Sequence, residues 1–315
     1  MTPKVSILLS IYKSEAYLSS WLKNVIQLSI WHEIELIIVA NAPSSREQEI
    51  ISEFLKSWRE QTHYIEVDRE NLYKSWNRCL NIATGKYCAI ANVDDLRTPD
   101  GLEQQVNILE KHLNYLFCFS DFWSVTTFPS TKGTLVNIPN YKEEELTRGM
   151  LAGPFFIWRR EDNNSRPIRF DEQFKSGGDF DFAVRLALAG QGFYHQEPVG
   201  YYLNQGTGLS TGSDLQPIER IVIELRYGIY DKIEYQYLPK AFDYDVKFIH
   251  LDNERIPISD FIDNYEEWIS SRQKDWFNQG LIRSSFFAFL KKSKTFLVLK
   301  KTKSMVTFLG RRIFK

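Results

Sequence analysis

Short apolar runs alternate with amphipathic stretches along the first third of the chain. Four stretches have the length and composition of β-strands, namely residues 5–12, 34–41, 63–68 and 86–92. Between them, apolar residues recur at intervals of three and four, which predicts helices carrying Leu18, Trp21, Leu22, Val25 and Leu28, then Ile50, Ile51, Phe54, Leu55 and Trp58, then Trp76, Leu80 and Ala83. Since strand and helix alternate, we expect a mostly parallel sheet with right-handed crossovers.

Polar residues at the start of these helices predict specific caps. Ser14 is expected to cap the first helix, and Ser45 with Gln48 is expected to form a capping box on the second. Thr98 is expected to cap a fourth helix with Pro99 in its first turn, where the missing N–H of proline costs nothing.

The pattern becomes less regular after this alternating region. We expect strands at residues 115–122, 153–161 and 192–203, the last with a proline break, a polar loop at 130–142, and helices at 143–151, 179–190, 218–233 and 258–271. The first strand is not followed by the GxGxxG turn of dinucleotide-binding proteins, so a nucleotide bound here must be held in another way. We predict an α/β domain over residues 1–214 and a helical extension over 215–315.

Composition excludes several classes of protein. A net charge of −1 argues against a general nucleic-acid binder. The three cysteines (Cys79, Cys88 and Cys118) form no CxxC pair and stand among apolar residues, so we expect buried free thiols in a reducing cytoplasm. No signal peptide is expected from the first residues, and no stretch approaches the roughly 18 consecutive apolar residues of a membrane span.

Charge is distributed unevenly along the chain. The last 40 residues hold ten Lys or Arg and no acid, so the other 275 carry 29 basic against 40 acidic residues. Apolar clusters interspersed with basic residues favour peripheral attachment to an anionic membrane, and a solvated or disordered basic tail is the alternative.

Two adjacent carboxylates, Asp94 and Asp95, follow the predicted strand at residues 86–92. The carboxyl edge of the strands is where open α/β sheets bind ligands. Carboxylate oxygens suit Mg²⁺ or Mn²⁺, which take a few such ligands together with substrate phosphates. The alternative is an acidic turn, since Asp also favours turns through local hydrogen bonds.

A third acid, Asp179, opens a predicted helix after Gly177 and Gly178. At a helix N-terminus an Asp is a good cap, and its ionised form is favoured there. Asp181, the second candidate at this helix start, lies two residues further along and should point elsewhere.

From the N-terminus to about residue 210, these motifs together resemble those of family 2 glycosyltransferases, enzymes of the GT-A fold. The similarity is carried by SILLSIYKSEAYL, IVANAPSS, RENLYKSWNRCLNIATG, NVDD and GGDFDFAVR. It implies a Rossmann-like, mixed and mostly parallel sheet flanked by helices, and transfer of a sugar with inversion from a nucleoside diphosphate sugar to a hydroxyl group.

The resemblance also implies roles for individual residues. Ser10, Ile11 and Tyr12 match the turn that holds the nucleobase, and Asn41 stands where the family usually has an acid. Asn71 and Asn77 match polar residues under the nucleotide, although turn or cap chemistry is an alternative for both. An amide can accept the hydrogen bond of a uracil N–H and can also donate, so nucleotide binding is retained and the choice of base stays open. The resemblance implies a UDP-sugar as the expected donor.

The motif that would bind the metal departs from the family pattern at its first position, which is Asn92. By resemblance Asp94 contacts the ribose, Asp95 with Asp94 holds Mg²⁺ or Mn²⁺, and Asp179 is the catalytic base with Arg185 at the expected spacing. Gly178 stands where an acid usually precedes the base, and Asn204 stands near the position of a histidine. His195 comes too early to match it.

Three functions remain open from the sequence. The first is a glycosyltransferase of cell-surface polysaccharide or glycolipid synthesis, peripheral on the inner membrane face, with a glycan or lipid-linked acceptor. The second is a nucleotidyltransferase, although SIYKSEAYL lacks the expected Gly-rich loop. The third is a non-catalytic module that binds nucleotide sugars within a membrane-associated complex.

Overall fold

The computed structural model describes residues 2–138, 152–160, 168–205, 214–228, 237–241 and 243–278. A seven-stranded sheet in the order β10-β6-β9-β4-β1-β2-β3 forms its centre. The strands are β1 (Val5–Ile11), β2 (Ile34–Asn41), β3 (Thr62–Val67), β4 (Tyr87–Ala91), β6 (Tyr115–Ser120), β9 (Phe156–Arg159) and β10 (Gln191–His195). Only β9 pairs antiparallel with its neighbours, so the predicted mixed and mostly parallel sheet is confirmed.

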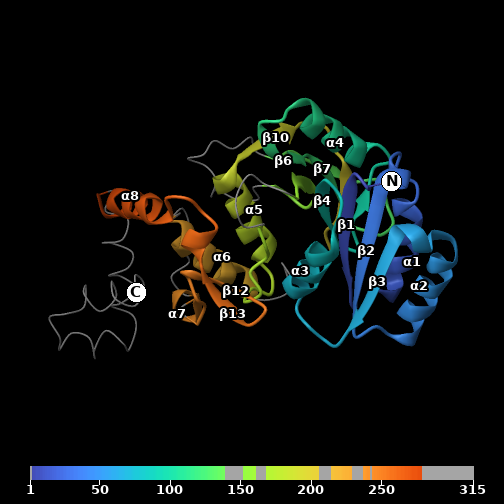
Figure 1. The fold of residues 1–315 in the computed structure, drawn as a ribbon, viewed down its shortest axis with the longest axis horizontal. Coiled ribbons are helices and arrows are strands. Elements are labelled where there is room, and N and C mark those ends of the chain that lie inside the picture. The colour runs from blue at the N-terminus through green and yellow to red at the C-terminus, as the bar shows by residue number, and fades with distance from the viewer. Residues whose placement is uncertain are drawn as a thin grey trace.

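Helices cover both faces of this sheet (Figure 1). They are α1 (Glu15–Val25), α2 (Ser45–Trp58), α3 (Leu72–Ile82), α4 (Gly101–Lys111) and α5 (Gly178–Ala189), and α6 (Leu215–Tyr227) lies beside α5. Side chains alternate along β1: Ile7 and Leu9 pack in the hydrophobic cluster of α1 and α4, whereas Leu8 packs in the cluster of α3, α5 and α6. The buried strands therefore contribute side chains to two hydrophobic cores, one on each face of the sheet.

A second sheet, in the order β5-β11-β7-β8, lies beside the carboxyl end of β4. It consists of β5 (Leu96–Arg97), β11 (Gly200–Leu203), β7 (Phe122–Val125) and β8 (Thr134–Val136). The prediction that Thr98 caps a helix was wrong, because the residues after the acid pair first form β5 and the N-cap of α4 is Asp100. The predicted strand at 192–203 divides into β10 and β11, which belong to different sheets.

Two further cap predictions need correction. The capping box of α2 is made by Ser44 and Glu47, one residue earlier than predicted. Ser14 occupies the N-cap position of α1 but makes no side-chain cap hydrogen bond, since its hydroxyl donates to the buried Glu47 carboxylate. Glu47 thus joins the starts of α1 and α2.

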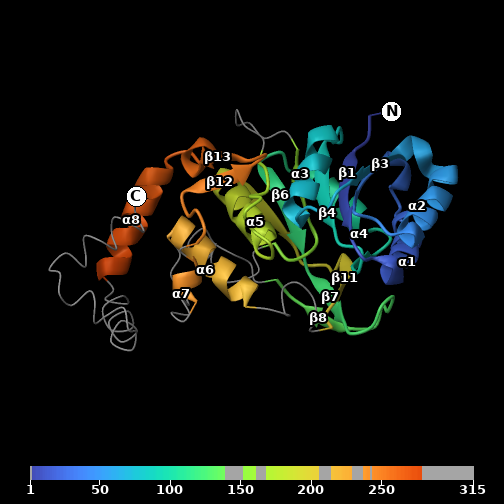
Figure 2. The same cartoon turned by 90° about the horizontal axis from the view of Figure 1, so that it is seen from below.

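Figure 2 shows α6 lying beside α5, and the other described elements after residue 214 follow it. It forms α6, α7 (Leu238–Ala241), the hairpin of β12 (Phe248–Leu251) and β13 (Glu254–Pro257), and α8 (Tyr265–Asn278), and short 3-10 turns lie at Trp31–Glu33, Arg59–Gln61 and Ile258–Asp260. Val222 of α6 and Ile258 belong to the same hydrophobic cluster as Leu8 of β1. The described part of the predicted extension therefore shares a core with the sheet.

Several predicted elements are shorter than expected or fall outside the described residues. α6 ends at Tyr227 because Gly228 adopts φ 69°, a left-handed conformation that ends helices. The helix predicted at 143–151 and the basic tail lie outside the described residues. All three cysteines are free and buried, as predicted. Within the described ranges, no helix has the length and apolar character to cross a membrane.

Candidate active site

Strand ends converge at one edge of the central sheet. β1 ends at Ile11, β2 at Asn41 and β4 at Ala91, and these three strands are parallel neighbours. The turn after β4 carries Asn92, Asp94 and Asp95. This is the edge at which α/β sheets bind ligands, so the predicted donor residues fall where the fold allows a site.

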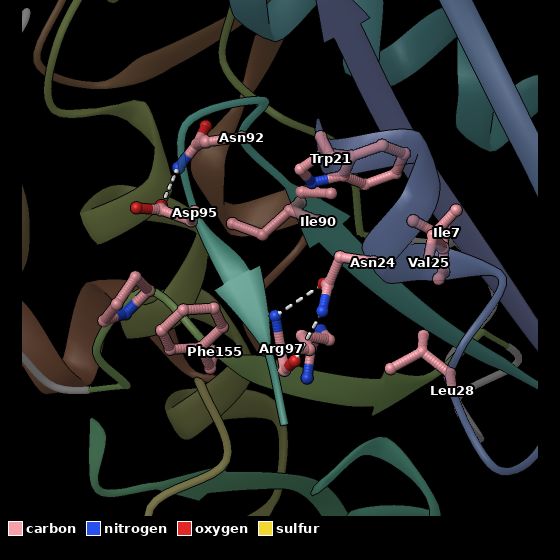
Figure 3. Close-up of a pocket in the computed structure, with 12 residues that line it drawn as sticks. Ile7, Trp21, Asn24, Val25, Leu28, Ile90, Asn92, Asp95, Arg97 and Phe155 are labelled. Carbon is pink, nitrogen blue, oxygen red and sulfur yellow. Dashed lines mark hydrogen bonds between the residues drawn. The ribbon is translucent and has the colours of Figure 1, made fainter. Parts of the chain in front are cut away.

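Asp95 is 6% exposed and is held by two hydrogen bonds, of which Figure 3 shows the one from Asn92. Asn92 Nδ2 donates to Asp95 Oδ2 at 3.0 Å, and the backbone N–H of Leu203 donates to Asp95 Oδ1 at 3.0 Å. The second bond ties the acid pair to β11. Asn92, which departs from the family pattern, therefore orients the carboxylate that follows it.

Ionisation is disfavoured at both carboxylates of the pair. Burial raises the pKa of Asp95, and the neighbouring charge of Asp94 raises it further. Burial also raises the pKa of Asp94. A divalent cation would relieve both effects, because it favours the charged form of each acid.

The donor atoms available at this turn fit a hard cation. Each Asp95 oxygen accepts one hydrogen bond, and an ionised carboxylate has about four lone-pair sites, so acceptor capacity remains. Within the described ranges, no group of three or more His, Cys, Asp or Glu residues is arranged as a metal site. Two carboxylates alone suit an ion such as Mg²⁺, which keeps several waters and takes substrate phosphates as ligands.

Arg97 is a buried cation behind the acid pair. Its guanidinium lies 5.4 Å from the Phe155 ring centroid and donates to Gln105 Oε1 at 3.1 Å, while its backbone is bonded to Asn24 (Figure 3). Burial lowers the pKa of Arg97 to about 10, against the opposing effect of Asp95. Arg97 therefore offsets part of the negative charge of the pair.

The predicted nucleobase turn is partly open to solvent. Ile11 is buried, Ser10 is half-buried and Tyr12 is 40% exposed. The Arg69 guanidinium lies 3.8 Å from the centroid of the Tyr12 ring. Tyr12 thus presents an aromatic face at the sheet edge, and Arg69 covers it in this structure.

Asn41 lies inside the protein, 1% exposed. Its Oδ1 accepts from the Glu70 N–H at 2.7 Å, and its Nδ2 donates to Ser75 Oγ at 2.9 Å. The amide therefore ties β2 to the segment before α3. Its contact with a nucleobase stays a prediction.

Asn71 and Asn77 attach α3 to residues 170–172. Asn71 caps α3 by accepting from the Lys74 N–H at 2.8 Å, and its amide donates to the Glu172 carbonyl. Asn77 both accepts from and donates to the Phe170 backbone, at 2.8 and 2.9 Å. The cap chemistry considered for Asn71 is present, and contact of either amide with a nucleotide stays a prediction.

Asp179 is the second residue of α5, whose N-cap position is taken by Gly177. Asp179 is exposed to solvent, and its Oδ1 accepts a hydrogen bond from the Phe180 N–H at 2.9 Å. Protein atoms crowd round the carboxyl group, and this desolvation raises its pKa to about 6, while hydrogen bonds from the Phe180 N–H and from Tyr73 act against the rise. An acid in this range is ionised at neutral pH and can take up a proton.

Asp181 points away from Asp179, as predicted, into a buried ionic network. It pairs with Arg185 at 2.8 Å and with Arg226 at 2.7 Å, and it accepts from the Tyr227 hydroxyl at 2.7 Å. Burial acts to raise the pKa of Asp181, but the two arginines hold it below its ordinary value. The Arg185 that matched the family spacing therefore serves Asp181.

The positions considered for a third metal ligand make other contacts. The Asn204 N–H donates to the Val125 carbonyl at 2.8 Å, and His195 Nε2 lies 2.9 Å from Gln104 Oε1. The Gly-rich loop predicted at residues 206–212 lies outside the described residues.

Contacts within the described ranges gather the predicted residues into two groups. Asn92, Asp94 and Asp95 lie at the end of β4 beside β11. Asn41, Asn71, Asn77 and Asp179 all contact α3 or its start, the last through Tyr73. α3 is thus the element shared by the nucleotide side and the predicted base.

Four residues that shape the site were missed by sequence reasoning: Arg97, Tyr73, Glu219 and Arg226. Tyr73 and Arg226 stand within helical patterns, where they are indistinguishable from ordinary packing or surface positions. Glu219 follows Ile218 and lies outside the apolar stripe of its predicted helix, so the pattern did not indicate its burial.

Sequence comparison supports the family resemblance. The Glycosyl transferase family 2 profile matches residues 6–166, just over half of the chain. The putative glycosyltransferase EpsE of Bacillus subtilis is 33% identical over 114 residues, covering 36% of this chain and 41% of EpsE. An uncharacterised glycosyltransferase of Methanocaldococcus jannaschii is 26% identical over 194 residues, covering 58% of this chain and 64% of that protein. The matches thus span less than two thirds of these relatives.

Solved structures confirm the fold. S. aureus TarS 1–349 in complex with UDP-GlcNAc superposes with a TM-score of 0.57 at 15% identity, over 77% of this chain and 73% of that one. The mannosyltransferase PcManGT from Pyrobaculum calidifontis, in complex with GDP-Man and Mn²⁺, gives a TM-score of 0.52 at 14% identity, over 100% and 86% of the two chains. The fold is that of GT-A glycosyltransferases. With this fold and the matching profile, the chain belongs to glycosyl transferase family 2.

Proposed function

We propose that this protein transfers a sugar, with inversion, from a nucleoside diphosphate sugar to a hydroxyl acceptor. The observation that supports this most is the pairing of two features on one GT-A fold. One is the carboxylate pair at the end of β4, and the other is the accessible Asp179 with a pKa of about 6 at the start of α5.

In this proposal the donor binds at the carboxyl edge of β1, β2 and β4. Tyr12 offers a stacking face to the base, and Ser10 and Ile11 form the turn beneath it. Asn41, Asn71 and Asn77 line or support the nucleotide side, and Asp94 contacts the ribose. Asp94 and Asp95 would hold Mg²⁺ or Mn²⁺, which when bound supplies positive charge to a leaving diphosphate.

Asp179 acts as the general base. The acceptor oxygen attacks the anomeric carbon from the face opposite the diphosphate and loses its proton to the Asp179 carboxylate. The bond between the anomeric carbon and the diphosphate oxygen breaks, and its electron pair leaves with the diphosphate. One displacement of this kind inverts the configuration at the anomeric carbon.

A thermal-shift screen of nucleotide sugars, with and without Mn²⁺, tests donor binding. A ligand that binds only the folded state at a hundred times its Kd stabilises by about 2.7 kcal/mol. TarS and PcManGT were solved with a uridine and a guanosine nucleotide respectively, so both bases belong in the screen. We expect a UDP-sugar to raise the melting temperature in Mn²⁺, and the absence of a shift with every nucleotide sugar would count against the proposal.

The carboxylate pair should control the response to metal. Asp94→Asn and Asp95→Asn should each remove most of the Mn²⁺-dependent part of donor binding, measured by calorimetry, because each change deletes a charged oxygen ligand. The matched control is Asp100→Asn, which removes an exposed acid from the same segment and should bind the donor normally. Equal Mn²⁺ dependence in all three variants would place the ion elsewhere.

We further propose that residues 1–214 form the transferase domain and that the acceptor is a glycan or a lipid-linked glycan of a cell surface. The basic residues after Asp275 would bring the protein to an anionic membrane. Deleting residues 284–315 should abolish sedimentation with vesicles that contain anionic lipid and leave donor hydrolysis intact. If the full chain does not sediment with these vesicles at low salt, the membrane role is wrong.

A further inference from the structure

Glu219 of α6 is fully buried, and protein groups occupy its carboxylate completely. Its Oε1 accepts from the Lys175 N–H at 2.8 Å and from the Tyr244 hydroxyl at 2.9 Å. Its Oε2 accepts from the N–H groups of Ser176 and Gly177 at 2.7 and 2.6 Å. These four donors fill the lone-pair sites of an ionised carboxylate, which accepts hydrogen bonds only.

The three backbone N–H groups belong to the turn that leads into α5. Gly178 packs against the Tyr73 ring of α3, and the Phe180 N–H donates to Asp179 Oδ1 at 2.9 Å. Three successive N–H groups, from Lys175 to Gly177, thus share one carboxylate of α6. Contacts with α6 and α3 therefore hold this turn in place.

The two glycines allow this close packing. A Cβ atom on Gly178 would lie 2.7 Å from the Tyr73 ring, and one on Gly177 would lie 3.2 Å from Glu219 Cβ. A side chain at position 178 would push α5 away from α3. The glycine that replaces the acid expected before the base is therefore required by the support around Asp179.

We propose that Glu219 is a positioning residue for Asp179, which it serves by fixing the turn at residues 175–177 and by its negative charge. The proposal rests on the proposed function, since it assumes that Asp179 is the base. In the described ranges, Glu219 from α6 and Tyr73 from α3 are the titratable groups that face the Asp179 carboxyl. The charge of Glu219 adds to desolvation in raising the pKa of Asp179, and Tyr73 acts in the opposite direction.

The test compares Glu219→Gln with the wild-type protein. A glutamine amide cannot accept four hydrogen bonds and carries no charge. We expect kcat to fall about tenfold with an unchanged KM for the donor, and the acid limb of the kcat–pH profile to move to lower pH. Glu219→Asp, which keeps the charge, should return the limb toward its original pH. Glu224→Gln removes another buried carboxylate from α6 and should leave the profile unchanged.

A ¹³C NMR titration of the Asp179 carboxyl gives a readout that needs no turnover, its signal being identified by its loss in Asp179→Asn. The midpoint should fall in Glu219→Gln, and amide exchange at residues 175–177 should accelerate. If Glu219→Gln does not fold, Tyr244→Phe, which removes one donor to Glu219, should show faster exchange at the same amides. An unchanged midpoint with unchanged exchange overturns the proposal, whereas absent turnover in the wild-type protein overturns the proposed function alone.

Discussion

Replacing Asp179 with Asn is expected to lower turnover by on the order of a hundredfold or more while leaving donor affinity near that of the wild-type protein. A positioned general base typically contributes this much. It acts on the acceptor proton in the transition state and has little role in holding the donor, so kcat falls without a matching change in Kd. Stopped-assay kinetics and calorimetry with the donor measure the two quantities separately.

Folding stability should not decrease in this variant. An asparagine can still accept from the Phe180 N–H, which donates to Asp179 Oδ1 at 2.9 Å. Because the folded protein raises the pKa of this acid to about 6, the ionised form is disfavoured by folding, and a neutral amide loses nothing at pH 7. Glu103→Gln, which alters an acid in the first turn of α4, is the matched control.

The Asp179 carboxyl group should also determine how kcat depends on pH. Asp179 must be ionised to accept a proton, so kcat should be constant well above pH 6 and fall about tenfold per unit below it. The Asp179→Asn variant should lose this acid limb together with its activity. A variant with normal turnover, or one that loses donor binding as well, would show that Asp179 is not the base.

Arg226→Met should destabilise the protein by about 3–5 kcal/mol, the usual cost of removing one partner from a buried ion pair. Arg226 is fully buried between Asp181 at 2.7 Å and Asp171 at 2.8 Å, and it donates to the carbonyls of Val246, Asp245 and Phe248. Methionine fills similar space but leaves both acids short of positive charge. Urea denaturation monitored by far-UV circular dichroism measures the change.

Two further variants serve as comparisons for the stability of Arg226→Met. Arg226→Lys keeps the charge but loses the planar set of donors, so it should recover only part of the stability. Arg46→Met makes the same substitution in an exposed pair with Glu49 and should change stability by less than about 1 kcal/mol. A stability loss in Arg226→Met no larger than that in Arg46→Met would show that the network does not hold α5 and α6 together.

The sheet was predictable because its strands have a simple signal. Residues 5–12, 34–41 and 86–92 are mostly apolar, which is typical of strands buried on both faces. The errors came where two local patterns compete within one or two residues. Ser44 and Ser45 both precede an acid or amide at cap spacing, and the stretch after Asp95 became β5 because it pairs with β11, about a hundred residues away.

The site was predictable only for side chains at strand and helix ends. Asp94, Asp95 and Asp179 stand at such ends, so their places follow from the local pattern. The groups that support them do not, because Leu203, Tyr73 and Glu219 approach from distant segments whose pairing no periodicity reveals. Asn41 also stands at a strand end, but its amide oxygen accepts from the Glu70 N–H and its amide nitrogen donates to Ser75. The sequence did not indicate either of these contacts.

The most direct test of the proposed function is the product formed from a nucleotide sugar in Mn²⁺. Incubation with a UDP-sugar of α configuration should release UDP, and early ¹H NMR spectra should show a β-configured product, whereas EDTA should stop the release. Formation of UTP and sugar 1-phosphate on addition of pyrophosphate would indicate a nucleotidyltransferase, and binding without turnover would indicate a non-catalytic module. Release of UDP with an α-configured first product would contradict inversion and the role of Asp179 as a general base.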